Sequence, residues 1–192
     1  MNRGLGRFVG AVPAPRPPPP ERCEMCGTGI PVEHGHVVDL EHRALMCACR
    51  PCYLLFTARG AGRYRAIPER VVRDEGLAEF EWDELQIPVG VVFVLNGQAF
   101  YPSPAGATEC LLDLAAWERV VAGHPLLGEA EPDVEAILLR RDERECFLVP
   151  VDSCYELVGL VRSTWQGFDG GAEAHTAITG FFDRLKARAG AS

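Results

Sequence analysis

Lysine is almost missing from this chain of 192 residues, in which Lys186 is the only lysine among 19 basic residues and the formal net charge is −8. A protein with this charge balance lacks the dense positive surface that nucleic acids and anionic membranes require. The 18 arginines are scattered along the chain, so we attribute their dominance to coding bias rather than to phosphate binding. The sequence therefore predicts no nucleic-acid partner.

Long apolar runs are also missing. No segment approaches the ~20 apolar residues that a membrane-spanning helix needs. The N-terminus carries arginines but not the apolar core of a signal peptide. We therefore expect a protein without a membrane span, located in the cytoplasm. In that reducing compartment, clustered thiols are typical of metal binding rather than of disulfides.

Several motifs of common enzyme classes are not present. The chain has no phosphate-binding loop, no dinucleotide-binding fingerprint and no Gly-x-Ser-x-Gly turn. His34, His36 and Asp39 could support chemistry of the His-Asn-His nuclease type. However, the only asparagines are Asn2 and Asn96, and no basic patch adjoins the histidines to hold a phosphate. The sequence thus disfavours a nuclease.

Three cysteines of the C-terminal half allow a second catalytic interpretation. Cys154 could be a nucleophile if His124 or His175 were its basic partner. The simpler interpretation is that Cys110, Cys146 and Cys154 are buried thiols, because free cysteine is among the most buried residue types. The sequence therefore disfavours an enzyme, and we assign no catalytic residue.

The other five of the eight cysteines lie within thirty residues, and their spacing is the strongest signal in the chain. They form Cys23-x2-Cys26 and, twenty residues later, Cys47-x-Cys49-x2-Cys52. Two Cys-x2-Cys pairs at this separation bring four thiolates to one point, which suits a tetrahedral metal ion. We assign Cys23, Cys26, Cys49 and Cys52 as ligands. Cys47 could substitute for Cys49, or pack as a small apolar residue.

The cysteines favour zinc but leave iron open. Four thiolates form a closed structural zinc site, yet the same tetrahedron holds iron in rubredoxin-like proteins, and clustered cysteines also hold iron–sulfur clusters. Rubredoxin-like sites carry glycine after both cysteine pairs, whereas Tyr53 follows the second pair here. His34 and His36 are alternative ligands, although surface polar histidines are the commoner explanation.

Residues 21–60 are expected to form a small metal-binding module, which we call the cysteine module. Gly27 allows the tight turn of a zinc knuckle after Cys26. Residues 36–40 and 44–47 suit a hairpin, and Arg50-Pro51 opens a helix that ends at Gly60. The order of knuckle, hairpin and helix resembles the treble-clef zinc fingers. Since so short a segment has little core, the metal should supply much of its stability.

The rest of the chain divides into three further parts. Residues 1–20 contain a proline-rich run and are expected to be a disordered tail. Residues 61–87 should connect the cysteine module to the remainder, with a short strand near 63–67 and a helix or packed loop within 69–86. Residues 88–189 are expected to form an α+β domain. The predicted fold class is therefore α+β, with a small zinc module preceding the larger domain.

The α+β domain should contain two hairpins and about three helices. Asn96-Gly97 is a strong hairpin turn, since both residues tolerate positive φ. Asp113 is a candidate N-cap, and Ser153-x-x-Glu156 reads as a capping box. The expected strands are 89–95, 98–101, 108–112, 134–140 and 146–149, and the expected helices are 114–122, 153–165 and 172–189.

Four segments together resemble a family of bacterial proteins that has no assigned activity. These segments are Cys23–Gly27, Leu45–Phe56, Phe100–Glu109 and Leu148–Gly159. Members of that family carry an N-terminal four-cysteine module of treble-clef or zinc-ribbon type and are often encoded beside nickel–iron hydrogenase genes. The resemblance implies a non-enzymatic, zinc-binding accessory protein whose partner is a hydrogenase subunit that it helps to assemble or stabilise. The alternative is a rubredoxin-like or iron–sulfur electron carrier that uses the same cysteines.

Overall fold

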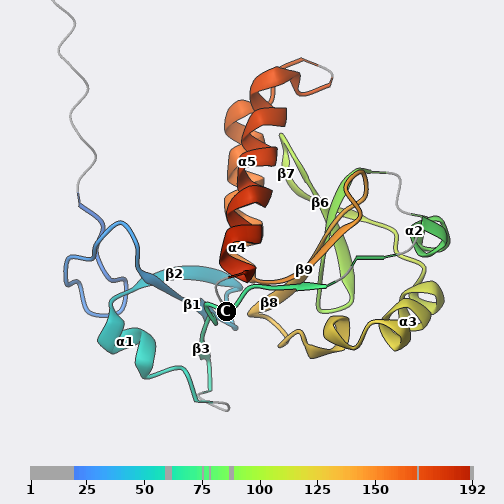
Figure 1. The fold of residues 1–192 in the computed structure, drawn as a ribbon. Coiled ribbons are helices and arrows are strands. Elements are labelled where there is room, and N and C mark those ends of the chain that lie inside the picture. The colour runs from blue at the N-terminus through green and yellow to red at the C-terminus, as the bar shows by residue number, and fades with distance from the viewer. Residues whose placement is uncertain are drawn as a thin grey trace, which may run out of the picture.

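The computed structural model describes residues 20–58, 62–74, 76–77, 79–86, 89–167 and 169–190. These residues form two antiparallel sheets and five α-helices, which is the α+β class that the sequence predicts (Figure 1). The proline-rich tail, expected to be disordered, and Gly60, expected to end a helix, lie outside the described residues. No helix in these ranges is long and apolar enough to cross a membrane.

The smaller sheet has the strand order β2-β1-β3. The hairpin of β1 (Gly35–Asp39) and β2 (Ala44–Ala48) is the one expected from the sequence. Its other neighbour is β3 (Tyr64–Ala66), which belongs to the segment expected to be a connection and pairs antiparallel with β1. Helix α1 (Arg50–Leu54) covers one face of this sheet, where its buried Tyr53 packs against β1.

Helix α1 ends earlier than the sequence predicts. The backbone N–H of Phe56 donates to Tyr53 in a tighter turn, and the carbonyl of Phe56 accepts from Ala66 N of β3 at 2.9 Å. The Phe56 ring packs against Tyr64 with 5.3 Å between centroids. Pairing with β3 therefore draws the chain out of the helix, a tertiary effect that overrides helical propensity.

The larger sheet has six strands in the order β4-β9-β8-β5-β6-β7. Its strands are β4 (Val72–Asp74), β5 (Val91–Leu95), β6 (Gln98–Ser103), β7 (Gly106–Cys110), β8 (Glu135–Arg140) and β9 (Glu145–Pro150). The helices around it are α2 (Glu79–Leu85), α3 (Leu114–Gly123), the short 3-10 helix η1 (Pro125–Glu129), α4 (Val151–Thr164) and α5 (Gly171–Ala189).

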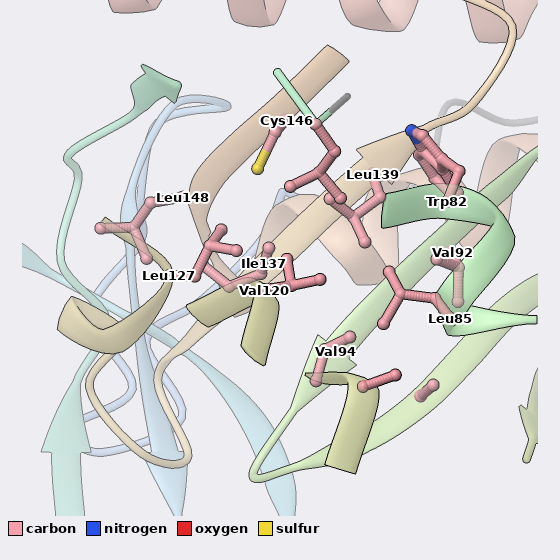
Figure 2. Packing of buried hydrophobic residues seen from close by; sticks show 13 residues of the cluster. Trp82, Leu85, Val92, Val94, Val120, Leu127, Ile137, Leu139, Cys146 and Leu148 are labelled. Atoms are coloured by element: carbon pink, nitrogen blue, oxygen red, sulfur yellow. The ribbon is translucent and has the colours of Figure 1, made fainter. Parts of the chain in front are cut away.

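Both faces of the larger sheet are covered by helices (Figure 1). Ile137 and Leu139 of β8 point into a core shared with α2, α3 and η1, which Figure 2 shows from close by. Their neighbours Ala136 and Leu138 point the other way, into a core shared with α4 and α5. Side chains alternate between the two faces of a strand. A sheet covered on both sides therefore needs apolar residues at every position, which is why β8 and β9 are almost continuously apolar.

Several predicted elements are confirmed by the structure. Asn96 and Gly97 form the turn between β5 and β6 with positive φ values of 52° and 75°. Asp113 is the N-cap of α3, where its side chain accepts a hydrogen bond from Ala116 N at 2.9 Å. The hairpin of β8 and β9 and the amphipathic helix α5 also lie close to where the sequence places them.

The predicted capping box at Ser153 is wrong. Helix α4 begins at Val151, its N-cap is Pro150, and Ser153 is buried inside the first turn. Pro150 is still paired with Glu135 in the sheet, and Val151 N donates to Val134 O at 2.9 Å. The helix thus follows the last paired residue of β9 without a loop. The end of strand pairing, rather than a local side-chain cap, determines where the helix begins. Strand β4, only three residues long, went unrecognised because such a length shows no alternation.

The two sheets meet through a small apolar cluster. Val38 of β1 packs with Ile67, Val134 and Val151, so β1 contacts the start of α4 and the approach to β8. Arg188, near the end of α5, donates a 3.2 Å hydrogen bond to Glu69 O, in the segment that follows β3. Strand β1 is therefore packed on both faces, by α1 through Val37 on one side and by the larger part of the molecule through Val38 on the other.

A half-buried histidine connects three elements beside the larger sheet. His124, directly after α3, contacts Asp74 of β4 through Nδ1 at 3.2 Å and Glu81 of α2 through Nε2 at 3.1 Å. Burial acts to lower the pKa of His124, but the hydrogen bonds to Asp74 and Glu81 outweigh it and raise the pKa above its usual value. The imidazolium form is thus favoured in the folded state.

Stability should depend on pH through His124. When the pKa of a histidine is higher in the folded state than in the unfolded state, its protonation stabilises the fold. This stabilisation is complete at pH values below the pKa of the unfolded state, and it is lost as the pH rises through the pKa of the folded state. We expect the wild type to exceed His124→Gln by on the order of 1 kcal/mol in unfolding free energy near pH 5. The difference should shrink towards about pH 9, well above the reference pKa of histidine. Urea unfolding at a series of pH values measures it, and a difference that grows with pH would contradict the assignment.

Candidate metal centre

The first cysteine pair lies on a tight backbone turn. Cys23 N donates to Thr28 O and Gly27 N donates to Cys23 O, both at 2.8 Å. Gly27 has a φ of 75°, which glycine adopts without the steric cost that a side chain brings. The backbone therefore makes the tight turn that the sequence predicts after Cys26. An isolated bridge between Arg22 and Gly29 closes its base.

The second pair lies at the start of α1. Cys49 is the N-cap residue and Cys52 lies in the first turn, with Pro51 between them in a position where proline loses no needed N–H. The phenol of Tyr53 donates a 2.8 Å hydrogen bond to Ile67 O and is 7% exposed. This contact anchors the helix to the chain beyond β3, so the second pair is held in place from outside its own segment.

The two pairs converge. The Sγ atoms of Cys23, Cys26, Cys49 and Cys52 all lie within 4.8 Å of one another. The Cys26 and Cys49 sulfurs are 3.7 Å apart. Four thiolates bound to zinc at about 2.3 Å in a tetrahedron stand about 3.8 Å apart. The spacing and the ligand type therefore fit one tetrahedral metal ion, and we call these residues the four-cysteine cluster.

Hydrogen bonds lower the pKa of two of the four thiols. Burial acts to raise the pKa of Cys23, but hydrogen bonds to the backbone of Cys49, Cys26 and Met25 bring it down to about 6. The side chain and backbone of Thr28 lower the pKa of Cys26. Both shifts favour the thiolate, the form that binds metal.

The neighbouring thiols favour the protonated form of Cys52. Hydrogen bonding to Cys49, followed by burial and the other thiols, raises the pKa of Cys52 to about 12. Like charges at one site cannot all ionise unless a cation balances them. Metal binding would therefore release protons from the cluster and weaken as the pH falls.

Cys47 lies outside the four-cysteine cluster. The hairpin register places it directly opposite His36, and one ligand atom each of His34, His36 and Cys47 lies within 4.8 Å of the others. The side chain of His34 is only 7% exposed, so a surface polar histidine is the wrong explanation for this residue.

A third group of potential metal ligands is paired with an arginine side chain. Asp39, Glu41 and His42 come together at the β1–β2 turn. The Arg63 guanidinium binds Asp39 through two hydrogen bonds and pairs with Glu41 at 2.9 Å. The same arginine holds the pKa of the Asp39 carboxyl well below its usual range. Asp39 therefore stabilises the turn and the sheet, which removes it from the nuclease interpretation.

The remaining cysteines do not have the properties of nucleophiles. Cys146 and Cys154 are fully buried, as predicted, and Cys110 is half-buried. Burial raises the pKa of both the Cys146 and the Cys154 thiols, which keeps them protonated. His124, one suggested partner of Cys154, is engaged with Asp74 and Glu81 instead.

Sequence reasoning did not identify two residues that support the ligand candidates. Thr28 hydrogen-bonds Cys26, and its place two residues after the knuckle cysteine was the available signal. Asp152 contacts His36 Nδ1 at 2.9 Å across 116 residues of sequence. No local pattern marks a contact over such a separation, so only the fold could reveal it.

Fold and site define an α+β protein in which a four-cysteine cluster lies beside a small sheet that packs on a larger one. The chain belongs to DUF5947, a family of unknown function whose profile matches residues 22–189. Neither curated proteins nor solved structures provide a match to this chain.

Proposed function

We propose that the four-cysteine cluster holds one zinc ion and that the protein is a non-enzymatic accessory factor. The convergence of four sulfurs within 4.8 Å, from a knuckle and a helix start, carries this proposal. All four positions of a tetrahedral ion would be filled by protein, which is the arrangement of structural rather than catalytic zinc. The knuckle, hairpin and helix have the order found in treble-clef zinc fingers.

The ion would supply stability that the apolar contacts of this segment do not. Among the residues that the structure describes, the core between β1, β2 and α1 has three buried apolar residues, Val37, Ala48 and Tyr53. Structural zinc contributes about 10–16 kcal/mol of apparent folding free energy in isolated zinc-finger peptides. A bound ion would therefore hold the knuckle and α1 together and fix the surface that this part of the protein presents.

An electron carrier with iron in the same cluster is the second candidate. The exposure of Cys26 favours it, because electron transfer needs a metal centre close to the surface. Against it, the second pair lies at a helix start and is followed by Tyr53, whereas rubredoxin-like sites have a glycine turn there. Zinc is therefore our first choice.

Metal analysis and colour separate the two candidates. We expect protein purified without added metal to contain zinc that survives dialysis against a weak chelator, and to be colourless. Iron in the same assay, together with the visible absorption of ferric thiolate, would replace the structural role with the redox role. Protein that holds no metal after expression in zinc-supplemented medium, yet melts as one cooperative unit, would overturn both.

We further propose a protein partner, specifically a subunit of a nickel–iron hydrogenase. The sequence resemblance described above supports this partner, and a zinc-braced surface would suit such a contact. Tagged wild-type protein should recover the hydrogenase subunit from a strain that produces both, and the tagged Cys26→Ser variant should not. Failure of the wild type to recover any hydrogenase subunit would exclude this partner and leave the metal proposal intact.

A further inference from the structure

Three residues beside the four-cysteine cluster form a separate group of nitrogen and sulfur donors. His34 precedes β1, His36 lies in β1 and Cys47 lies opposite His36 in β2. One ligand atom of each lies within 4.8 Å of the others. The two histidine rings meet edge to face with 4.8 Å between centroids. The strand register therefore brings the three side chains to one face of the small sheet.

His34 offers a buried nitrogen that has no partner. Its Nδ1 lies 2.9 Å from Pro31 O and 3.1 Å from Val32 O, and since carbonyl oxygens only accept, Nδ1 carries the proton. Nε2 is buried and makes no hydrogen bond. Nε2 thus presents a bare lone pair.

His36 is oriented in the same manner by a carboxylate. Its Nδ1 lies 2.9 Å from Asp152 Oδ2, on the first turn of α4. Donation from Nδ1 to this carboxylate leaves the Nε2 lone pair available. Histidines that bind metal nearly always donate their other N–H to a carboxylate or a backbone carbonyl. His34 and His36 show one of each arrangement.

The surroundings of the group are acidic. Glu24 accepts a hydrogen bond from Cys47 N, Glu21 lies 3.6 Å from His34 Nδ1, and Asp152 binds His36. Two neutral imidazoles and one thiolate would leave a divalent ion with a single excess positive charge. The three carboxylates can balance that charge without binding the ion themselves.

We propose that His34, His36 and Cys47 form a second metal site, distinct from the four-cysteine cluster, that takes a divalent ion of the zinc class. Two imidazoles and a thiolate are borderline to soft ligands, which favour zinc and its neighbours over magnesium or calcium. Three protein ligands leave one position of a tetrahedron open. The cluster is closed by four thiolates, so the two sites would differ in kind.

Two of the three proposed ligands line a cavity. His34, His36 and Asp152 line a cleft of about 1120 Å³ between the small sheet, α4 and α5, whose wall also includes Arg50 and Arg184. An ion could enter from this side, and water or a small ligand could occupy the fourth position there. Asp152 belongs to the larger part of the molecule, so an ion at this site would also tie the cysteine module to α4.

Cobalt titration of the full chain tests the site. Starting from protein whose four-cysteine cluster is filled with zinc, we expect the wild type to bind one further Co²⁺ per chain, with a sulfur-to-cobalt charge-transfer band. His34→Gln and Cys47→Ser should keep the first ion and bind no second one. Asp152→Ala should weaken the second ion by about 10- to 100-fold, since it removes a positioning residue. Asp152→Asn, which retains an acceptor oxygen, should recover part of that loss.

Matched controls guard against surface binding and misfolding. His175→Gln on α5 and Cys110→Ser on β7 remove the same chemical groups outside the site and should bind the second ion as the wild type does. Native mass spectrometry counts the ions, and circular dichroism monitors the fold. The proposal is overturned if the wild type binds no second Co²⁺, or if His34→Gln binds it with an unchanged spectrum. If His34→Gln does not fold, wild-type affinity in Asp152→Ala overturns it instead.

Discussion

Replacing Cys26 with serine is expected to release the metal ion from the four-cysteine cluster and to unfold the cysteine module. Serine is a poor ligand for a soft ion, so only three thiolates would remain to bind it. The variant would also remove the Cys26 sulfur that lies 3.7 Å from the Cys49 sulfur. The small apolar core of Val37, Ala48 and Tyr53 cannot compensate for the lost ligand. The expected result is loss of the chelator-resistant metal and of the fold around it.

Hydrogen exchange can show which part of the chain is lost. In Cys26→Ser, amide protection should disappear from β1, β2 and α1 while β8 and β9 keep theirs, because the larger sheet has its own two cores. Cys110→Ser is the matched control, since Cys110 is half-buried and lies outside the cluster. Wild-type metal content and protection in Cys26→Ser would remove Cys26 from the ligand set.

Replacing Phe182 with alanine should destabilise the larger part of the protein by about 3–5 kcal/mol. Phe182 of α5 is fully buried, its ring lies 5.5 Å from Phe181 and 6.1 Å from Phe147 between centroids, and the Arg140 guanidinium lies 5.0 Å from it. Truncation would leave a cavity between α5 and β9 that rigid neighbours cannot fill. Urea unfolding followed by tryptophan fluorescence measures the change.

An exposed leucine provides the comparison for Phe182. Leu111 is 94% exposed, so Leu111→Ala should change the unfolding free energy by no more than about 0.5 kcal/mol. The metal content of Phe182→Ala should equal that of the wild type under native conditions, because Phe182 lies in a different core from the four-cysteine cluster. A loss below about 1 kcal/mol in Phe182→Ala would mean that α5 does not pack on the sheet as described.

Local signals predicted much of the fold. The turn at Asn96-Gly97 and the N-cap at Asp113 lie where the sequence places them, because each depends on the conformational preferences of one or two residues. The start of α4 was mispredicted for the opposite reason. Ser153 has the pattern of a cap, but the end of β9 at Pro150 sets the helix start. A competing tertiary contact is invisible to a local rule.

The proximity of the four cysteines was predictable, and the second group of donors was not. The two cysteines of a Cys-x2-Cys pair are held close together by their short spacing in the sequence. Only the distance between the two pairs then depends on the fold. The contact between His36 and Cys47 can be predicted only if the hairpin register is known to the residue. A shift of the register by one residue moves each side chain of the strand to the other face of the sheet. Asp152 reaches His36 only after α4 has packed against the small sheet.

By itself, the sequence determined the α+β class, the knuckle with its thiols and the main helices and hairpins, since these follow from residue type, spacing and periodicity along one stretch of chain. Only the tertiary structure decided that β3 and β4 complete the two sheets, that Cys47 lies with His34 and His36, and that Asp152 orients one of those histidines. Each of those outcomes joins segments far apart in the chain, and their pairing depends on burial and register that no local pattern records.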